Sequence, residues 1–307
     1  MGSKLGYYLF VRPLSMLPLS VLYVFSDLFY LLTISVFPYR KKVISENLKR
    51  SFPKLSEKKI KAIRRQFYRH FADILVEGIA NLHLSKKQLE KRVRVLNPEV
   101  MDALFNEGKS VVLVGGHFNN WEWVISSQNF LFKHQAFGIG MPMSNKFWDA
   151  KVNAKRQRFG MNVIHAGNFK EALAEEKGSP IAVLTLSDQA PGDARKSYWM
   201  EFLNQQTPVL FGTEMMAHDY NFAVVFFSLK KIKRGSYTME LKLITENPKE
   251  MKWGEITEAH VHLLEKEINE NPPYWLWSHK RWKREIPKNL IELKKEQHAK
   301  FNSRFGY

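Results

Sequence analysis

The segment SVVLVGGHFNNWE, which starts at Ser110, constrains the fold more than any other part of the chain. Residues 111–114 form a short run of apolar residues, which is typical of a strand buried on both faces. Two glycines follow, and glycine permits backbone angles that other residues avoid. Asn119 or Asn120 can then cap a helix that begins near Trp121. The segment therefore predicts a strand, a turn and a helix, a unit of α/β proteins.

His117 lies between the expected strand and the expected helix, and Glu122 follows it in the first helical turn. A histidine so placed can act as a general base, and the glutamate could fold back to orient its ring. The free N–H groups at the helix N-terminus could bind an oxyanion or a phosphate. This pattern favours transfer of a group onto a hydroxyl. The alternative is a core histidine that is satisfied by a carboxylate at a strand-to-helix turn.

The His-x4-acid spacing is a weak signal by itself. About one match is expected by chance, and the chain has three. The pairs His260/Glu265 and His262/Glu267 both lie in residues 257–268, which have the pattern of one amphipathic helix. Five residues along a helix correspond to a rotation of about 140°, so these side chains cannot easily meet. We interpret both pairs as part of a solvated helix face.

The charge of the chain restricts its partners. The formal net charge is +17 and the isoelectric point is near 9.8, which favours nucleic acid, phospholipid headgroups or an acidic carrier protein. The sequence has no cysteine, which excludes disulfides and any thiol nucleophile within the chain. If an acyl thioester is used, its thiol therefore belongs to the donor. The histidines form no ligand pattern, so we expect neither a metal site nor a cofactor.

The N-terminal part of the chain is apolar. Asp27 is the one formal charge in residues 14–37. At about 1.5 Å per residue, a helix of this length would cross a hydrocarbon core of ~30 Å. Arg40, Lys41 and Lys42 follow, and such basic residues tend to stay on the cytoplasmic side. We therefore predict a membrane-spanning helix, with the rest of the chain in the cytoplasm.

Pro13, Pro18 and Asp27 weaken a simple span, so a helix lying in the membrane interface is the alternative. A cleaved signal peptide is not expected, because the apolar run is too long and no small-residue cleavage site follows. Two basic stretches, residues 40–69 and 280–304, predict amphipathic helices. Their charges fit an ordinary solvated face or attraction to anionic lipid.

Apolar runs alternate with helical patterns through the rest of the chain. This alternation predicts a single α/β domain whose mixed sheet is covered by helices. The further strands are expected at residues 137–141, 161–164, 181–186, 222–229 and 237–244, and helices at residues 146–158 and 169–176.

Four sequence blocks carry a family resemblance. They are GGHFNNWE around His117, MPMSNK at residues 141–146 with RQRFG at 156–160, SDQAPG at 187–192, and PYWLWSHKRWK at 273–283. In these blocks and their order the chain resembles the late acyltransferases of lipid A biosynthesis, the lauroyl and myristoyl transferases. Their wider relatives are the lysophospholipid and glycerolipid acyltransferases, whose His-x4-Asp signature has Glu122 in the acid position here. The resemblance implies a glycerolipid-acyltransferase-like fold.

The resemblance also implies an activity. Such enzymes move a fatty acyl chain from acyl carrier protein to a hydroxyl of a lipid A precursor at the cytoplasmic face of the bacterial inner membrane. His117 would be the general base, and Glu122 would stabilise its imidazolium without a covalent acyl-enzyme. On this basis residues 1–40 are the membrane anchor and residues 41–307 the catalytic domain. No cofactor and no nucleic acid are expected.

The resemblance points to further site residues, each with an alternative. Arg156 or Arg158 would bind substrate, or be helix surface, and they lie about 200° apart on a helix, so only one can readily face the site. Asp188 would be a polar site residue, or a helix cap or turn residue. His279 and Arg281 follow an aromatic cluster, and they would contact a phosphate at the membrane interface or end a strand that packs into the core.

The acceptor stays open at this stage. Nothing in His117 and Glu122 chooses between a lipid A precursor and another membrane lipid such as a lysophospholipid, an aminolipid or a glycolipid. The competing class is a non-catalytic protein that binds anionic membranes or nucleic acid. The chain has no helix-turn-helix, RNA-recognition or zinc pattern, and its apolar N-terminus argues against that class.

Overall fold

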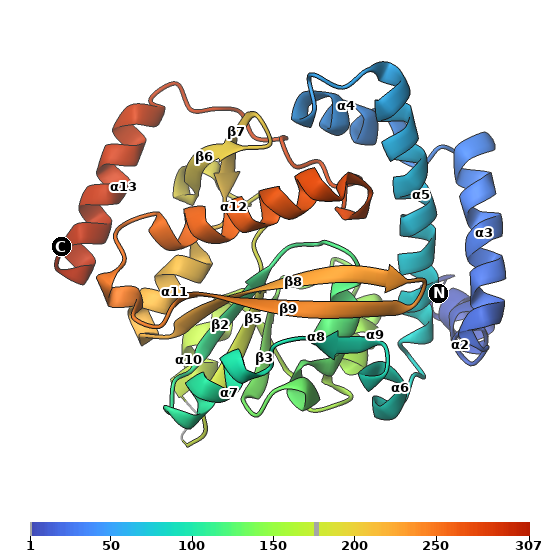
Figure 1. The fold of residues 1–307 in the computed structure, drawn as a ribbon, viewed down its shortest axis with the longest axis horizontal. Helices are drawn as coiled ribbons and strands as arrows, with labels where there is room; N and C mark the ends of the chain where they lie inside the picture. Colours follow the sequence, from blue (N-terminus) through green and yellow to red (C-terminus); the bar gives the residue numbers. More distant parts are fainter. Residues whose placement is uncertain (1, 175–177) are drawn as a thin grey trace.

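A mixed sheet forms the centre of the computed structural model, which describes residues 2–174 and 178–307. Among these residues, seven strands take the order β1-β9-β8-β2-β5-β3-β4 (Figure 1). Neighbouring strands are parallel except for the antiparallel pair β8 and β9. Two other strands, β6 and β7, form a separate antiparallel hairpin. The strands are β1 (Val93–Val95), β2 (Val111–Gly115), β3 (Gln135–Gly140), β4 (Asn162–His165), β5 (Ile181–Leu186), β6 (Tyr198–Phe202), β7 (Gln205–Val209), β8 (Ala223–Lys233) and β9 (Ser236–Thr245).

Helices cover both faces of this sheet (Figure 1). They are α1 (Gly2–Gly6), α2 (Arg12–Ser15), α3 (Leu19–Ser35), α4 (Lys41–Ser51), α5 (Glu57–Ala80), α6 (Lys86–Glu90), α7 (Glu99–Asn106), α8 (Trp121–Leu131), α9 (Lys146–Gln157), α10 (Phe169–Ala174), α11 (Gly212–Tyr220), α12 (Glu255–Glu270) and α13 (Leu290–Phe305). A π-helical turn, η1 (Tyr7–Val11), joins α1 to α2, and short 3-10 turns lie at η2 (Ala166–Asn168), η3 (Ala194–Lys196), η4 (Pro248–Glu250) and η5 (Pro272–Tyr274).

Strand β2 is buried along its whole length. Val112 and Val114 belong to one hydrophobic core, together with residues of α12 and the β6–β7 hairpin. Val111 and Leu113 belong to a second core on the opposite face, together with residues of α7 and α8. Successive side chains of a strand point to opposite faces, so a continuous apolar run is what a strand between two helical layers requires.

The expected α/β fold is confirmed. The predicted strand at residues 181–186 is β5, and the other four runs become β3, β4, β8 and β9 with shifted ends. The predicted helix at 146–158 is α9, which ends one residue earlier, at Gln157. The predicted helix at 169–176 is α10 as far as Ala174, while Glu175 and Glu176 lie outside the described residues. Strand β1 and the β6–β7 hairpin are additional to the prediction.

The prediction of one membrane-spanning helix is wrong. In the part of the chain that the structure describes, no helix combines the length and apolar character needed to cross a bilayer. Helix α2 ends at Ser15, and α3 begins at Leu19 and has 17 residues. The break falls at Pro18, which has an extended backbone and no N–H to donate.

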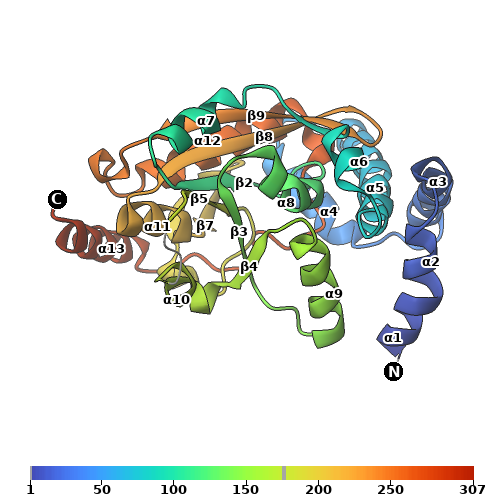
Figure 2. The ribbon, with the colours of Figure 1, turned by 90° about the horizontal axis from the view of Figure 1, so that it is seen from below.

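Residues 2–39 form an N-terminal arm that packs on α5 through α3 (Figure 1). The first turns of the arm extend from the body beside α9 (Figure 2). The face of α3 toward the protein includes polar groups: the Ser26 hydroxyl donates to Asp73, and Asp27 pairs with Arg234 at 2.7 Å. Many apolar side chains of the arm are exposed instead, including Leu5, Leu9, Phe10, Met16, Val24, Leu28, Leu31, Val36 and Phe37.

Candidate active site

The sheet brings His117 and Asp188 together. Strands β2 and β5 are parallel neighbours, and Gly115 at the end of one is in register with Leu186 at the end of the other. The pairing continues one residue further, because the Ser187 N–H donates to the carbonyl of Gly115 at 3.2 Å. His117 and Asp188 each stand two residues beyond these strand ends. They are therefore brought together by strand order. They lie beyond the carboxyl ends of the strands, where α/β proteins bind ligands.

Asp188 holds His117 through two hydrogen bonds. Its Oδ1 is 2.6 Å from Nδ1 of the His117 ring, and its Oδ2 accepts the His117 backbone N–H at 2.8 Å. The indole N–H of Trp275 also donates to Oδ2, at 2.8 Å. Burial alone would raise the pKa of Asp188, but the charge of His117 and these hydrogen bonds hold it at about 2. The carboxylate is therefore charged at neutral pH.

These contacts define the proton positions on the ring of His117. A carboxylate only accepts hydrogen bonds, so Nδ1 carries the proton of the neutral ring and Nε2 carries the lone pair. The Nε2 atom lies 3.1 Å from the amide nitrogen of Gln189, and the side chain is 15% exposed. The ring of Trp121 packs against the imidazole edge to face, with 5.0 Å between centroids. This arrangement suits proton transfer at Nε2.

The two glycines before His117 serve close packing. Neither has a positive φ; the left-handed residue of this turn is Asn119, at φ 53°. A Cβ on Gly115 would lie 2.5 Å from the ring of Phe227, and one on Gly116 would lie 2.7 Å from Leu264. The expectation of unusual glycine backbone angles is therefore wrong. The glycines let the turn lie against β8 and α12.

Glu122 is bound to two cations rather than to His117. In residues 2–174 and 178–307, the hydrogen-bond partners of the His117 ring are Asp188 and Gln189. The carboxylate of Glu122 accepts from Lys155 at 2.6 Å and from the guanidinium of Arg156, both on α9. Burial alone would raise the pKa of Glu122, but the charges of Lys155 and Arg156 hold it well below its usual range. Glu122 does not fold back onto His117 as expected, because Lys155 and Arg156 of α9 are charged partners for its carboxylate.

The two predicted arginines take different directions. Arg156 contacts Glu122, whereas Arg158 donates to the carbonyls of Leu82 at 2.6 Å and Leu84 at 2.5 Å. Arg158 thus ties α9 to the loop after α5.

The last of the four sequence blocks, residues 273–283, lies beside His117 and Asp188. The segment after η5 runs antiparallel to the turn at His117: the Leu276 N–H donates to the His117 carbonyl at 3.2 Å. Nε2 of His279 accepts the N–H of Ala190 at 2.9 Å, and burial lowers the pKa of His279 to about 4. Arg281 is 1% exposed and donates to the carbonyl of Pro208 at 2.8 Å. The position of Arg281 matches the core-packing alternative.

A cavity of about 390 Å³ lies between α5 and this segment. Its apolar wall includes Tyr39, Phe71, Ile74 and Leu75, and its other residues include Trp121, Glu122 and His279. Trp121 contacts the ring of His117, and His279 contacts the loop that carries Asp188 and Gln189. The cavity is thus adjacent to the histidine and suits an apolar chain. Within the described residues, no group of three or more histidine, aspartate or glutamate side chains could hold a metal ion.

The model of the bacterial lipid A biosynthesis acyltransferase family matches residues 5–284. The chain belongs to this family. It is therefore an acyltransferase of bacterial lipid A biosynthesis. No curated protein matches the chain.

The sequence of this lipid A acyltransferase did not predict several of the residues that contact His117, Asp188 or Glu122. Gln189 and Trp275 lie inside two of the family-like blocks, but only strand order brings them to His117 and Asp188. Lys155 immediately precedes Arg156, and nothing in the sequence marks it as the partner of Glu122. The interpretation of His260 as solvated is wrong: it is 3% exposed, whereas His262 on the same helix is exposed.

Proposed function

We propose that this acyltransferase moves a fatty acyl chain from acyl carrier protein to a hydroxyl of a lipid A precursor, with His117 as general base. The observation that carries the proposal is the bond from Nδ1 of His117 to Asp188, which leaves Nε2 with the lone pair. A base held in this tautomer by a buried carboxylate is the arrangement that activates a hydroxyl.

The reaction follows from these groups. Nε2 of His117 takes the proton of the acceptor hydroxyl while the hydroxyl oxygen attacks the thioester carbonyl carbon. Asp188 stabilises the resulting imidazolium. The carbon–sulfur bond then breaks, and the leaving thiolate takes the proton back from Nε2. The Trp123 N–H of α8 is already bound by the side chain of Asn120. The N–H groups of Trp121 and Glu122, which precede it in the same turn, would stabilise the transient oxyanion. The Gln189 amide at Nε2 gives way to the hydroxyl.

Glu122 has a positioning role in this proposal. Its carboxylate fixes Lys155 and Arg156 of α9 against the start of α8, which follows His117 in the chain. Glu122 and Trp121 also line the 390 Å³ cavity, whose apolar wall fits the fatty acyl chain of the donor.

We propose that the N-terminal arm lies in the membrane interface, with residues 41–307 as the catalytic domain at the cytoplasmic face of the inner membrane. The exposed apolar residues of the arm and its polar contacts to the body support this placement. A helix whose apolar face turns away from its own protein suits the acyl–headgroup boundary. The net charge of +17 suits both anionic lipid and an acidic carrier protein.

The test is acyl transfer from acyl carrier protein or coenzyme A thioesters to lipid, followed by mass spectrometry. His117→Ala should lower the rate by about 10² to 10⁴. The matched control is His262→Ala, because His262 has the same spacing to Glu267 but is exposed on α12, and it should keep wild-type transfer. Equal rates for both variants and the wild type would remove His117 from the mechanism.

The acceptor is identified separately from the base. Lipids of a deletion strain, compared with the wild type by mass spectrometry, should show a lipid A species that lacks one acyl chain. An unchanged lipid A together with a changed lysophospholipid, aminolipid or glycolipid would contradict the proposed acceptor.

A further inference from the structure

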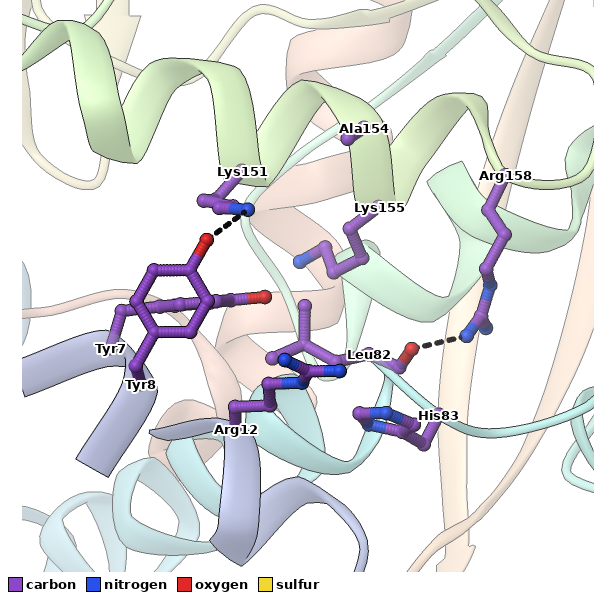
Figure 3. A pocket seen from close by; sticks show the side chains of 9 residues that line it. All are labelled: Tyr7, Tyr8, Arg12, Leu82, His83, Lys151, Ala154, Lys155 and Arg158. Atoms are coloured by element: carbon purple, nitrogen blue, oxygen red, sulfur yellow. Dashed lines mark hydrogen bonds between the residues drawn. The ribbon is translucent and has the colours of Figure 1, made fainter. Parts of the chain in front are cut away.

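A second cavity, of about 380 Å³, lies between the N-terminal arm and α9. Figure 3 shows its side chains: Lys151, Lys155 and Arg158 come from or directly follow α9, and Arg12 faces them from the arm. Tyr7 and Tyr8 close one end, and His83 lies at the other. We call this cavity the arm pocket.

The arm pocket gathers four cationic side chains and has no carboxylate in its lining. Among the described residues, the guanidinium of Arg12 has no hydrogen-bond or ion-pair partner. Lys151 is 3.5 Å from the Tyr8 hydroxyl and lies over the ring of Tyr7, at 4.8 Å. Lys155 is paired with Glu122, and Arg158 donates to the carbonyls of Leu82 and Leu84. Arg12 and Lys151 are therefore the cations most available to an anion, and an anion that they share removes the cost of holding like charges together.

The chemistry of these groups selects the anion. Guanidinium and ammonium groups bind phosphate oxygens through charge-assisted hydrogen bonds. Lys155 has a second role, because its ammonium also bonds Glu122 at 2.6 Å and thereby separates the arm pocket from the candidate active site. Tyr7 and Tyr8 belong to the same N-terminal turns as the exposed residues Leu5, Leu9 and Phe10. This end of the pocket would therefore lie near the headgroups of a membrane.

We infer that the arm pocket binds a phosphoryl group, such as that of an anionic lipid headgroup. The phosphoryl site stands on its own residues, whereas its link to the acceptor lipid rests on the proposed function. A phosphorylated lipid held here would contact Lys155 and would be anchored next to Glu122. The arm and α9 together form the site, so the ligand would also hold the arm to the body.

The experiment measures binding rather than catalysis, so that it can succeed or fail apart from the proposed function. Full-length protein is titrated with phosphatidylcholine vesicles with and without phosphatidic acid, and with inorganic phosphate. Arg12→Gln and Lys151→Gln should each weaken binding to the phosphatidic acid vesicles about tenfold, the usual effect of losing one charge-assisted hydrogen bond. Lys151→Arg, which keeps the charge, should retain most of the binding.

The matched control is Lys146→Gln, which removes the same charge from an exposed position of the same helix. It should bind like the wild type. If the wild type prefers phosphatidic acid vesicles and the pocket variants lose this preference, the site binds a lipid headgroup. If inorganic phosphate binds as tightly and the same variants weaken its binding, the site binds free phosphate. If the control weakens binding as much as the pocket variants, general charge attraction explains the data and the inference is overturned. Thermal midpoints of all variants report whether each remains folded.

Discussion

Asp188 is buried and keeps its negative charge, and its carboxylate fixes the orientation and the tautomer of the His117 ring. Its two oxygens accept three hydrogen bonds, from the ring and backbone of His117 and from the indole of Trp275. Burying a charge without such partners would be costly. The carboxylate therefore fixes the ring through Nδ1 and leaves Nε2 to react. Gln189, at 3.1 Å from Nε2, occupies the position that an acceptor hydroxyl would take.

Asp188→Asn should lower acyl transfer by about 10² to 10⁴, because the amide can donate to the ring, favour the wrong tautomer and no longer stabilise an imidazolium. Rates with acyl carrier protein as donor, measured together with membrane binding, check this expectation. Membrane binding should stay unchanged. A variant with the full wild-type rate would show that Asp188 serves the fold alone.

Glu122→Gln should destabilise the protein as well as slow it. The change leaves Lys155 and Arg156, which are 8% and 23% exposed, without their carboxylate. Breaking a mostly buried pair in this way costs about 3 kcal/mol. Urea unfolding gives the stability, and the transfer rate gives the activity. A lower activity with unchanged stability would instead place Glu122 in the chemistry itself.

At the scale of elements, apolar runs were sufficient to predict β2, β5 and the first part of β8, because these segments are buried on both faces. The β6–β7 hairpin was missed for a local reason. Its turn residues, Leu203 and Asn204, both have positive φ, at 51° and 61°, whereas such turns are usually marked by Asn-Gly or Asp-Gly. The pairing of His117 with Asp188 was missed for a different reason. Both residues were predicted as site residues, but their contact depends on β2 lying beside β5, which no local pattern indicates.

The N-terminal arm makes a prediction about membrane attachment. Its exposed apolar residues should hold the protein on membranes through hydrophobic insertion, which salt does not screen. The full chain should therefore stay in the membrane pellet after a high-salt wash. Phe10→Glu combined with Phe37→Glu, two exposed positions, should release a large fraction. Release of the wild type by salt alone would show that only the basic helices attach the protein.

At the scale of the whole molecule, buried neutral histidines link the fold to pH. His218 is 2% exposed and lies against Phe301 and Phe305 of α13, so it joins the C-terminal helix to the body. Among the described residues, neither of its ring nitrogens has a hydrogen-bond partner. Burial lowers the pKa of His218 to about 4 and that of His260 to about 3. Both rings are therefore neutral in the folded protein at moderately acidic pH.

This neutrality predicts that each of the two histidines removes stability in acid. Between the unfolded pKa of about 6.5 and the lowered folded values, each of these two histidines binds more protons in the unfolded chain, so its contribution to the free energy of unfolding falls as the pH falls. At pH 5 each of the two histidines should cost about 2 kcal/mol relative to pH 8. Urea unfolding of the wild type and of His218→Leu at the two pH values isolates the contribution of His218, because the other titrating groups are common to both proteins. The wild type should lose about 2 kcal/mol more than the variant between pH 8 and pH 5. If the variant and the wild type lost the same stability between pH 8 and pH 5, then His218 would not be a source of the acid sensitivity.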